Sequence, residues 1–197
     1  MSAIRLIVIG GSAGAVDALA KILPALPARF AIPVAIVVHQ PPDKNSVLAE
    51  VLSTKCALPV READDKEPIS PGVVYLASPN YHLLVERSGC FSLSVDDPVH
   101  FSRPAIDVLF ESAAEAMGEA LLGVLLSGAN EDGAEGLARI RDGGGITVVQ
   151  SPSSALVAAM PAAALRLGTP NHVLPIGQIG PFLAAVPQSQ ALKRSHP

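Results

Sequence analysis

The chain has 197 residues, of which 49% are hydrophobic and 16% are charged, and its formal net charge at pH 7 is -4. This length and composition indicate one globular domain with a sizeable core and exclude a disordered chain. The small negative charge gives no electrostatic reason to expect nucleic acid or an anionic membrane as a partner.

The first predicted element is a buried strand over residues 4–9, with the sequence IRLIVI. It runs directly into Gly10-Gly11-Ser12-Ala13-Gly14, and a helical pattern follows over Val16–Leu26. The apolar runs that predict further strands cover residues 34–39, 73–77, 123–127 and 146–150, and the helical patterns cover 46–53, 104–117 and 131–141. Continuous apolar strands separated by amphipathic helices predict an α/β fold: a doubly wound, mostly parallel sheet with helices on both faces.

Residues 82–97 interrupt this alternation with a hairpin-like pattern whose turn is Ser88-Gly89. This pattern predicts a small antiparallel excursion from the parallel sheet. We place one domain at residues 1–186 and a frayed tail at 187–197, because the last residues have little apolar surface to bury.

Signals for export or membrane insertion are missing from the sequence. No apolar run approaches the roughly 18 residues that span a bilayer, and the N-terminus lacks the features of a signal peptide. We therefore expect a cytoplasmic protein with no direct membrane insertion. The two cysteines, Cys56 and Cys90, are expected to be ordinary thiols.

The glycine-flanked Ser12 is the first candidate functional residue. A dinucleotide fingerprint that starts at Gly10 would need glycine at Ser12 and Ala15, and no Walker lysine is present, so a nucleotide site is poorly supported. The same stretch satisfies G-x-S-x-G, in which a strained turn exposes a nucleophilic serine above the sheet. The alternative is a serine that caps the following helix.

A candidate base and a candidate acid follow two other predicted strands. His39 ends the apolar run 34–39, and the carboxyl ends of parallel strands share one edge, so we expect it near Ser12; the alternative is a strand-end histidine bonded to backbone. Asp132, in the turn after the strand that stops near Ser127, is the expected acid. Glu131 and Asp107 remain rival acids, and Asp132 also fits an acid in a first helical turn. We predict no metal site and no cofactor, because no His, Cys or Asp pair has ligand spacing.

At these residues the sequence resembles the catalytic domain of the chemotaxis protein-glutamate methylesterases, the CheB family. The similar stretches are IGGSAGAVDAL, VVHQPP, SRPAIDVLFES, LLSGANEDGAEGL and VVQSPSSALVAAMP, between about Ile4 and Leu183. The resemblance implies that Ser12 is the nucleophile, His39 the base and Asp132 the orienting acid. It also implies that the N–H groups of Ala13 and Ala129 form an oxyanion hole.

The resemblance further implies a substrate and partners. The expected substrate is a glutamyl γ-methyl ester on the cytoplasmic helices of a chemoreceptor, and glutamine deamidation is an implied second activity. Another ester, or a regulatory binding module without catalysis, remains an alternative, because Ala15 and the loop Gly128-Ala129-Asn130 depart from the usual family pattern. The pattern begins at residue 4, where many relatives carry a receiver domain, so we expect a stand-alone form controlled by a separate regulatory protein; a truncated chain is the alternative.

Two polar residues near the predicted site have a functional and a structural interpretation. Arg103, just before a predicted helix, could steer an acidic substrate, or it could be a solvated arginine. Gln150, at the end of the strand 146–150, could contact substrate, or its amide could be satisfied within the protein.

Overall fold

A seven-stranded parallel sheet forms the centre of the protein, in the computed structural model that describes residues 3–40 and 47–187. The strand order is β3-β4-β2-β1-β7-β8-β9. The strands are β1 (Leu6–Gly11), β2 (Val34–Val38), β3 (Val60–Glu62), β4 (Val74–Leu76), β7 (Leu121–Leu125), β8 (Ile146–Gln150) and β9 (His172–Leu174). Strands β1, β2 and β7 are buried along their whole length, which explains why each reads as a continuous apolar run.

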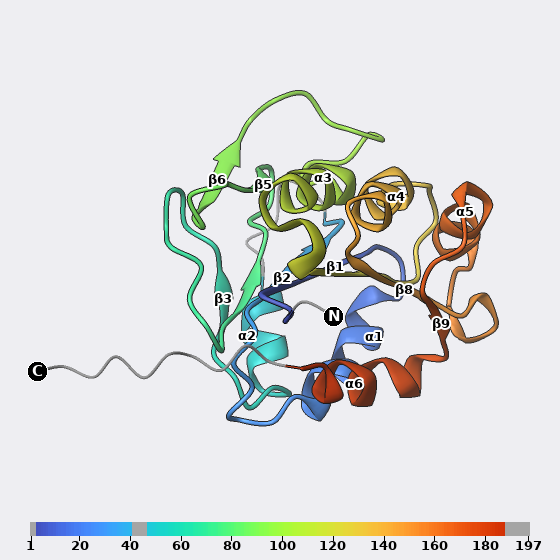
Figure 1. Cartoon of the computed structure of the whole chain (residues 1–197), viewed down its shortest axis with the longest axis horizontal. Coiled ribbons are helices and arrows are strands. Elements are labelled where there is room, and N and C mark those ends of the chain that lie inside the picture. Colours follow the sequence, from blue (N-terminus) through green and yellow to red (C-terminus); the bar gives the residue numbers. More distant parts are fainter. Residues whose placement is uncertain (1–2, 41–46, 188–197) are drawn as a thin grey trace, which may run out of the picture.

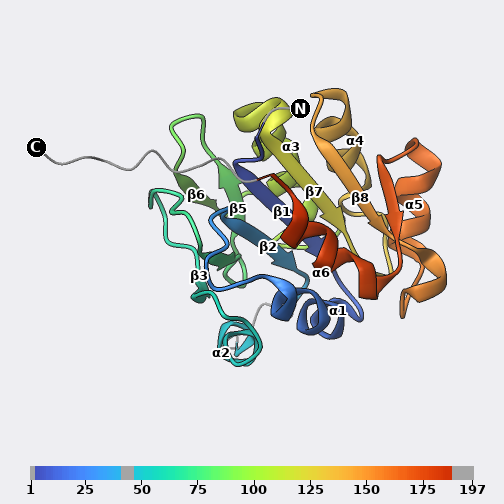
Figure 2. The ribbon, with the colours of Figure 1, turned by 60° about the horizontal axis from the view of Figure 1, so that its bottom comes forward.

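Helices cover both faces of the sheet, as predicted (Figure 1). One face carries α3 (Ile106–Met117), α4 (Ala134–Asp142) and α5 (Ala159–Leu167), and the other carries α1 (Ala15–Ile22), α2 (Leu48–Ser53) and α6 (Ile176–Ala185). Figure 2 shows α1 and α6 side by side on the face of the sheet that is turned forward. Alternate side chains of β1 enter the two cores: Leu6 and Val8 pack with the α3 side, and Ile7 and Ile9 with the α1 side.

The predicted excursion is a two-stranded antiparallel sheet, formed by β5 (His82–Val85) and β6 (Phe91–Ser94). Gly89 in its turn has a φ of 81°. The hairpin lies beside α3, where the Val85 N–H donates to Ser112 Oγ at 3.1 Å.

Some elements escape the sequence pattern. Edge strands β3 and β9 have three residues each, which is too short for a periodic signal. Helix α6 contains Pro181, a residue that ordinarily ends a helix. The predicted tail from residue 188 onward, and residue 46 of the predicted helix 46–53, lie outside the described residues. None of the described helices combines the length and apolar character needed to cross a membrane.

The order in which strands join the sheet changes side at β1: β2 to β4 lie on one side of it, and β7 to β9 lie on the other. Strand β1 pairs with β2 on one side and with β7 on the other, and helices α1 and α3 lie on opposite faces. Open α/β sheets bind ligands at the carboxyl ends of the strands beside such a switch point. Ser12, His39 and Asp132 follow these three strands.

Candidate active site

Ser12 lies one residue beyond β1, in a tight turn into α1. Its N–H donates to Ser127 O at 2.9 Å, and its carbonyl accepts the Ala15 N–H at 2.9 Å. Gly14 has a φ of 82°, and a Cβ there would lie 2.7 Å from Leu156 Cβ, so this position requires glycine. The left-handed residue of this turn is Gly14, and Ser12 itself has no positive φ.

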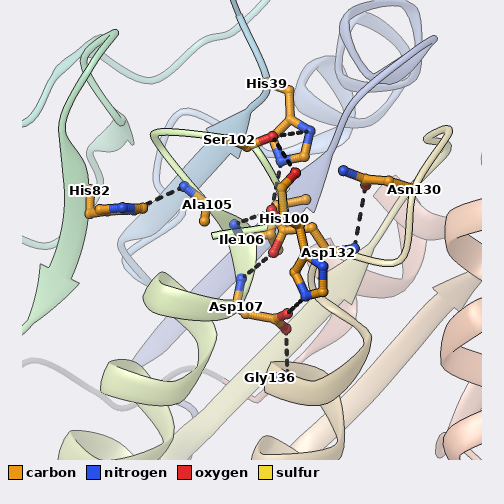
Figure 3. Close-up of polar contacts among 10 residues, drawn as sticks. All are labelled: His39, His82, His100, Ser102, Ala105, Ile106, Asp107, Asn130, Asp132 and Gly136. Carbon is orange, nitrogen blue, oxygen red and sulfur yellow. Dashed lines mark hydrogen bonds and ion pairs between the residues drawn. The ribbon is translucent and has the colours of Figure 1, made fainter. Parts of the chain in front are cut away.

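His39 lies one residue beyond β2, next to Ser12. The last paired residues of the two strands are Gly11 and Val38, and the His39 N–H donates to Gly11 O at 3.2 Å. The imidazole turns toward the loop after β7, where Nε2 lies 2.6 Å from Asp132 Oδ2 (Figure 3). The His39 side chain is 13% exposed, whereas that of Asp132 is fully buried.

The Asp132 carboxylate also binds the N-terminus of α3. Oδ2 accepts the Ile106 N–H at 2.8 Å, and Oδ1 accepts the Asp107 N–H at 2.9 Å. Burial raises the pKa of the Asp132 carboxyl, but the hydrogen bonds from His39 and these two N–H groups outweigh it and leave the pKa below its ordinary value. The helix dipole favours the same charged form. A carboxylate at Nε2 holds the imidazole hydrogen there, so Nδ1 carries the lone pair that can accept a proton.

The two rival acids occupy different places. Glu131 is exposed, and Asp107 points away from His39: its Oδ1 accepts the Gly136 N–H at 2.7 Å and its Oδ2 lies 3.2 Å from His100 Nε2. Burial raises the pKa of Asp107 to about 6, and the nearby charge of Asp132 adds to the rise. The geometry therefore selects Asp132 as the partner of His39.

His100, Asp107 and Asp132 form the one cluster of three potential metal ligands in the described part of the chain, with ligand atoms within 4.8 Å of one another. Sequence spacing misses this cluster because tertiary packing assembles it. The carboxylates of Asp107 and Asp132 accept hydrogen bonds from backbone N–H groups, and His100 contacts Asp107. These contacts explain why the three side chains lie together next to His39.

The structure adds Ser102, the first residue of the stretch SRPAIDVLFES, to which the sequence analysis assigned no role. Its Oγ lies 3.3 Å from Nδ1 of His39, on the opposite side of the ring from Asp132 (Figure 3). The hydroxyl of Ser12 makes no hydrogen bond within residues 3–40 and 47–187. His39 is thus held between Asp132 and Ser102, with Ser12 just beyond the end of the adjacent strand.

Ala13 and Ala129 lie in two loops that Ser127 joins. Ser127 Oγ donates to Ala13 O at 2.7 Å, and Ala129 lies two residues further along the chain. Both alanines are exposed, and neither N–H has a hydrogen-bond partner among the described residues. Ser102 and Ala129 line the same cleft, whose volume is about 610 Å³.

Arg103 and Gln150 both make contacts within the protein. The Arg103 guanidinium donates to Asn80 Oδ1 and to the carbonyls of Val95 and Asp96. Gln150 is 2% exposed; its Oε1 accepts the Ser127 N–H at 2.9 Å and its Nε2 donates to Ser154 O at 3.0 Å. The Gln150 amide is therefore satisfied within the protein, which was the structural interpretation of this residue. Arg103 is held by intramolecular hydrogen bonds at the surface, and its role toward an acidic substrate stays a prediction.

Comparison with known proteins identifies the family. The family model for CheB methylesterase matches residues 7–183. The chain belongs to the CheB methylesterase family. The resemblance at the sequence motifs is thereby confirmed.

Relatives in the CheB methylesterase family differ in length. A putative protein-glutamate methylesterase/protein-glutamine glutaminase of Leptospira interrogans is 44% identical over 188 residues, covering 95% of this chain and 97% of the relative. A protein-glutamate methylesterase/protein-glutamine glutaminase of Symbiobacterium thermophilum is 41% identical over 175 residues, or 89% of this chain and 48% of the relative. The chain thus spans nearly all of one relative and about half of the other.

The CheB methylesterase catalytic domain of Thermotoga maritima has the same fold. The two structures superpose with a TM-score of 0.88 at 32% identity, over 93% of this chain and 98% of that domain. The predicted α/β fold class is confirmed.

Proposed function

We propose that this chain is a protein-glutamate methylesterase that removes methyl groups from glutamyl γ-methyl esters of chemoreceptors. The observation that carries the proposal is the contact of His39 with the buried Asp132, at 2.6 Å, beside a serine at the carboxyl edge of a CheB-type sheet. The relatives' names support both the ester and the amide reaction.

Ser12 supplies the nucleophile in this mechanism. Its Oγ attacks the ester carbonyl while Nδ1 of His39 takes the hydroxyl proton, because Nε2–H is committed to Asp132. Asp132 stabilises the imidazolium that results. The N–H groups of Ala13 and Ala129, which have no partner among the described residues, are the proposed donors to the oxyanion.

Collapse of the tetrahedral intermediate breaks the bond to the methoxy group. His39 returns its proton to the leaving oxygen, so methanol departs and a glutamyl ester of Ser12 remains. Water, deprotonated by His39, attacks this ester and releases a glutamate carboxylate and the Ser12 hydroxyl. A glutamine side chain presents the same carbonyl, and its reaction would release ammonia in place of methanol.

The proposed partner is the cytoplasmic helical region of a methylated chemoreceptor, which places the enzyme in the cytoplasm. We propose that residues 1–186 form the catalytic unit and that a separate protein regulates it.

Methanol release from methylated receptor by the purified chain tests the proposal. We expect Ser12→Ala to abolish both methanol release and labelling by an alkyl fluorophosphonate, because alanine fits the turn and lacks the nucleophile. Ser53→Ala, at an exposed serine in α2, is the matched control and should retain wild-type activity. More than a few per cent of residual activity in Ser12→Ala would contradict the assignment. Fluorophosphonate labelling without methanol release would indicate a different ester as substrate, and absence of both would indicate a binding module.

A further inference from the structure

A tight turn over residues 99–102 carries two contacts to the active-site network. The N–H of Val99 donates to Ser102 O at 3.1 Å, and the N–H of Ser102 donates to Val99 O at 2.9 Å. The two central residues, His100 and Phe101, have φ values of 49° and 60°. Positive φ at both central positions is the signature of a type I′ turn, which ordinarily selects glycine or asparagine. Two other residue types in this backbone conformation point to a constraint beyond chain reversal.

The side chains of His100 and Ser102 contact different residues of the active-site network. His100 Nε2 lies 3.2 Å from Asp107 Oδ2, and Ser102 Oγ lies 3.3 Å from His39 Nδ1 (Figure 3). Phe101, between them, is fully exposed. Arg103, the residue after the turn, donates hydrogen bonds from its guanidinium to the carbonyls of Val95 and Asp96. The backbone conformation therefore places Ser102 against the imidazole.

We propose that Ser102 is a positioning residue for His39, and this rests on the proposed role of His39 as the base toward Ser12. Asp132 holds the imidazole at Nε2, and Ser102 holds it at Nδ1. A single contact would let the ring rotate about its bond to the chain. Two contacts on opposite sides keep Nδ1 in the orientation from which it accepts the proton of Ser12.

A hydroxyl suits this position because it can donate or accept. While His39 is neutral, the Ser102 O–H donates to the Nδ1 lone pair. After Nδ1 has taken the proton of Ser12, it can donate to Ser102 Oγ, and the Ser102 hydrogen turns to His100 O, 3.4 Å away. Ser102 exchanges no proton in either state. Its contact at 3.3 Å is longer than a strong hydrogen bond and can yield to the transferring proton.

The test uses the purified chain with two measurements. One is the rate constant of inactivation by an alkyl fluorophosphonate, which reports the nucleophilicity of Ser12 without any receptor. The other is kcat and KM for methylated receptor. We expect Ser102→Ala to lower both the inactivation rate and kcat by about three- to tenfold, the usual effect of one lost hydrogen bond, with KM within about twofold.

Rescue and a control separate positioning from a general structural effect. Ser102→Thr keeps the hydroxyl and should restore both rates to near wild type. Ser94→Ala removes a hydroxyl that accepts the Asp96 N–H at 3.0 Å in the same excursion, and it should leave both rates unchanged.

Three results would show that Ser102 does not position His39. They are wild-type rates in Ser102→Ala, a threonine variant as slow as the alanine variant, and an effect confined to KM. Labelling that persists in Ser12→Ala and disappears in Ser102→Ala would make Ser102 the nucleophile. If only the methylesterase proposal fails, the chain reacts with the fluorophosphonate but does not turn over methylated receptor. The inactivation rates of wild type and Ser102→Ala would then still test whether Ser102 positions His39.

Discussion

At the scale of single residues, Asp132 combines three tasks. One fully buried carboxylate accepts hydrogen bonds from His39 and from two N–H groups of α3. These bonds keep it ionised, orient the imidazole and satisfy the end of a helix. A neutral substitute cannot perform all three, since an amide offers one acceptor oxygen and places a donor on the other side.

We predict that Asp132→Asn lowers kcat by about 10³- to 10⁴-fold, because the amide no longer holds the hydrogen on Nε2 of His39. Unfolding in urea should show reduced stability as well, since one N–H group of α3 loses its acceptor. Glu131→Gln neutralises the adjacent exposed acid and should keep activity within about twofold of wild type, as for most surface substitutions. A larger loss in Glu131→Gln than in Asp132→Asn would reassign the acid.

At the scale of elements, the site depends on the close approach of α3 to β1. Gly10, in β1, has no side chain, and a Cβ at this position would overlap Cγ2 of Ile106 at the start of α3. The Ile106 N–H is one of the donors to Asp132. The glycine thus allows the helix terminus to reach the carboxylate from above the sheet.

Gly10→Ala tests this coupling. We expect the free energy of unfolding to fall by about 1–3 kcal/mol, as for other overpacked cores, and kcat to fall because Asp132 is displaced. Gly177→Ala is the control: a Cβ at this helical position meets nothing within 4 Å, and alanine favours a helix. Urea unfolding and methanol release measure both effects. If a folded Gly10→Ala variant keeps the wild-type kcat, the packing of α3 on β1 does not control the position of Asp132.

At the scale of the whole molecule, two buried carboxylates give opposite contributions to the pH dependence of stability. The lowered pKa of Asp132 adds stability at pH values above its unfolded pKa, and this is lost as pH falls through the folded value. Burial raises the pKa of Asp107 to about 6 from an unfolded value of 3.8. The folded state therefore binds this proton more tightly, and the Asp107 contribution to stability falls as pH rises through this interval.

Asp107→Asn should consequently be as stable as wild type near pH 4 and more stable at pH 7, by on the order of 2 kcal/mol. The amide oxygen can still accept the Gly136 N–H. Urea unfolding at both pH values measures the difference. Asp142→Asn is the control, at an exposed acid paired with Arg141. Its free energy of unfolding, relative to wild type, should change little between the two pH values. If the stability difference between Asp107→Asn and wild type does not grow with pH, burial does not destabilise the charged form of Asp107.

The sequence by itself determined the central strands of the sheet and the edge that carries the site. Long apolar strands are legible because burial on both faces removes polar positions, and β1, β2 and β7 are such strands. Residues that follow parallel strands share one edge, so the sequence placed Ser12, His39 and Asp132 on that edge, and the structure added that their strands are direct neighbours.

Only the tertiary structure decided how the side chains at that edge are bonded. Ser102 is 63 positions from His39, and its contact depends on a turn that two non-glycine residues hold at positive φ. Gln150 is buried because its amide bonds the backbone of Ser127 and Ser154, and Arg103 lies at the surface on the carbonyls of Val95 and Asp96. The nitrogen of His39 that faces Asp132 likewise depends on where α3 begins. Such contacts join residues far apart in the chain, and local periodicity carries no information about them.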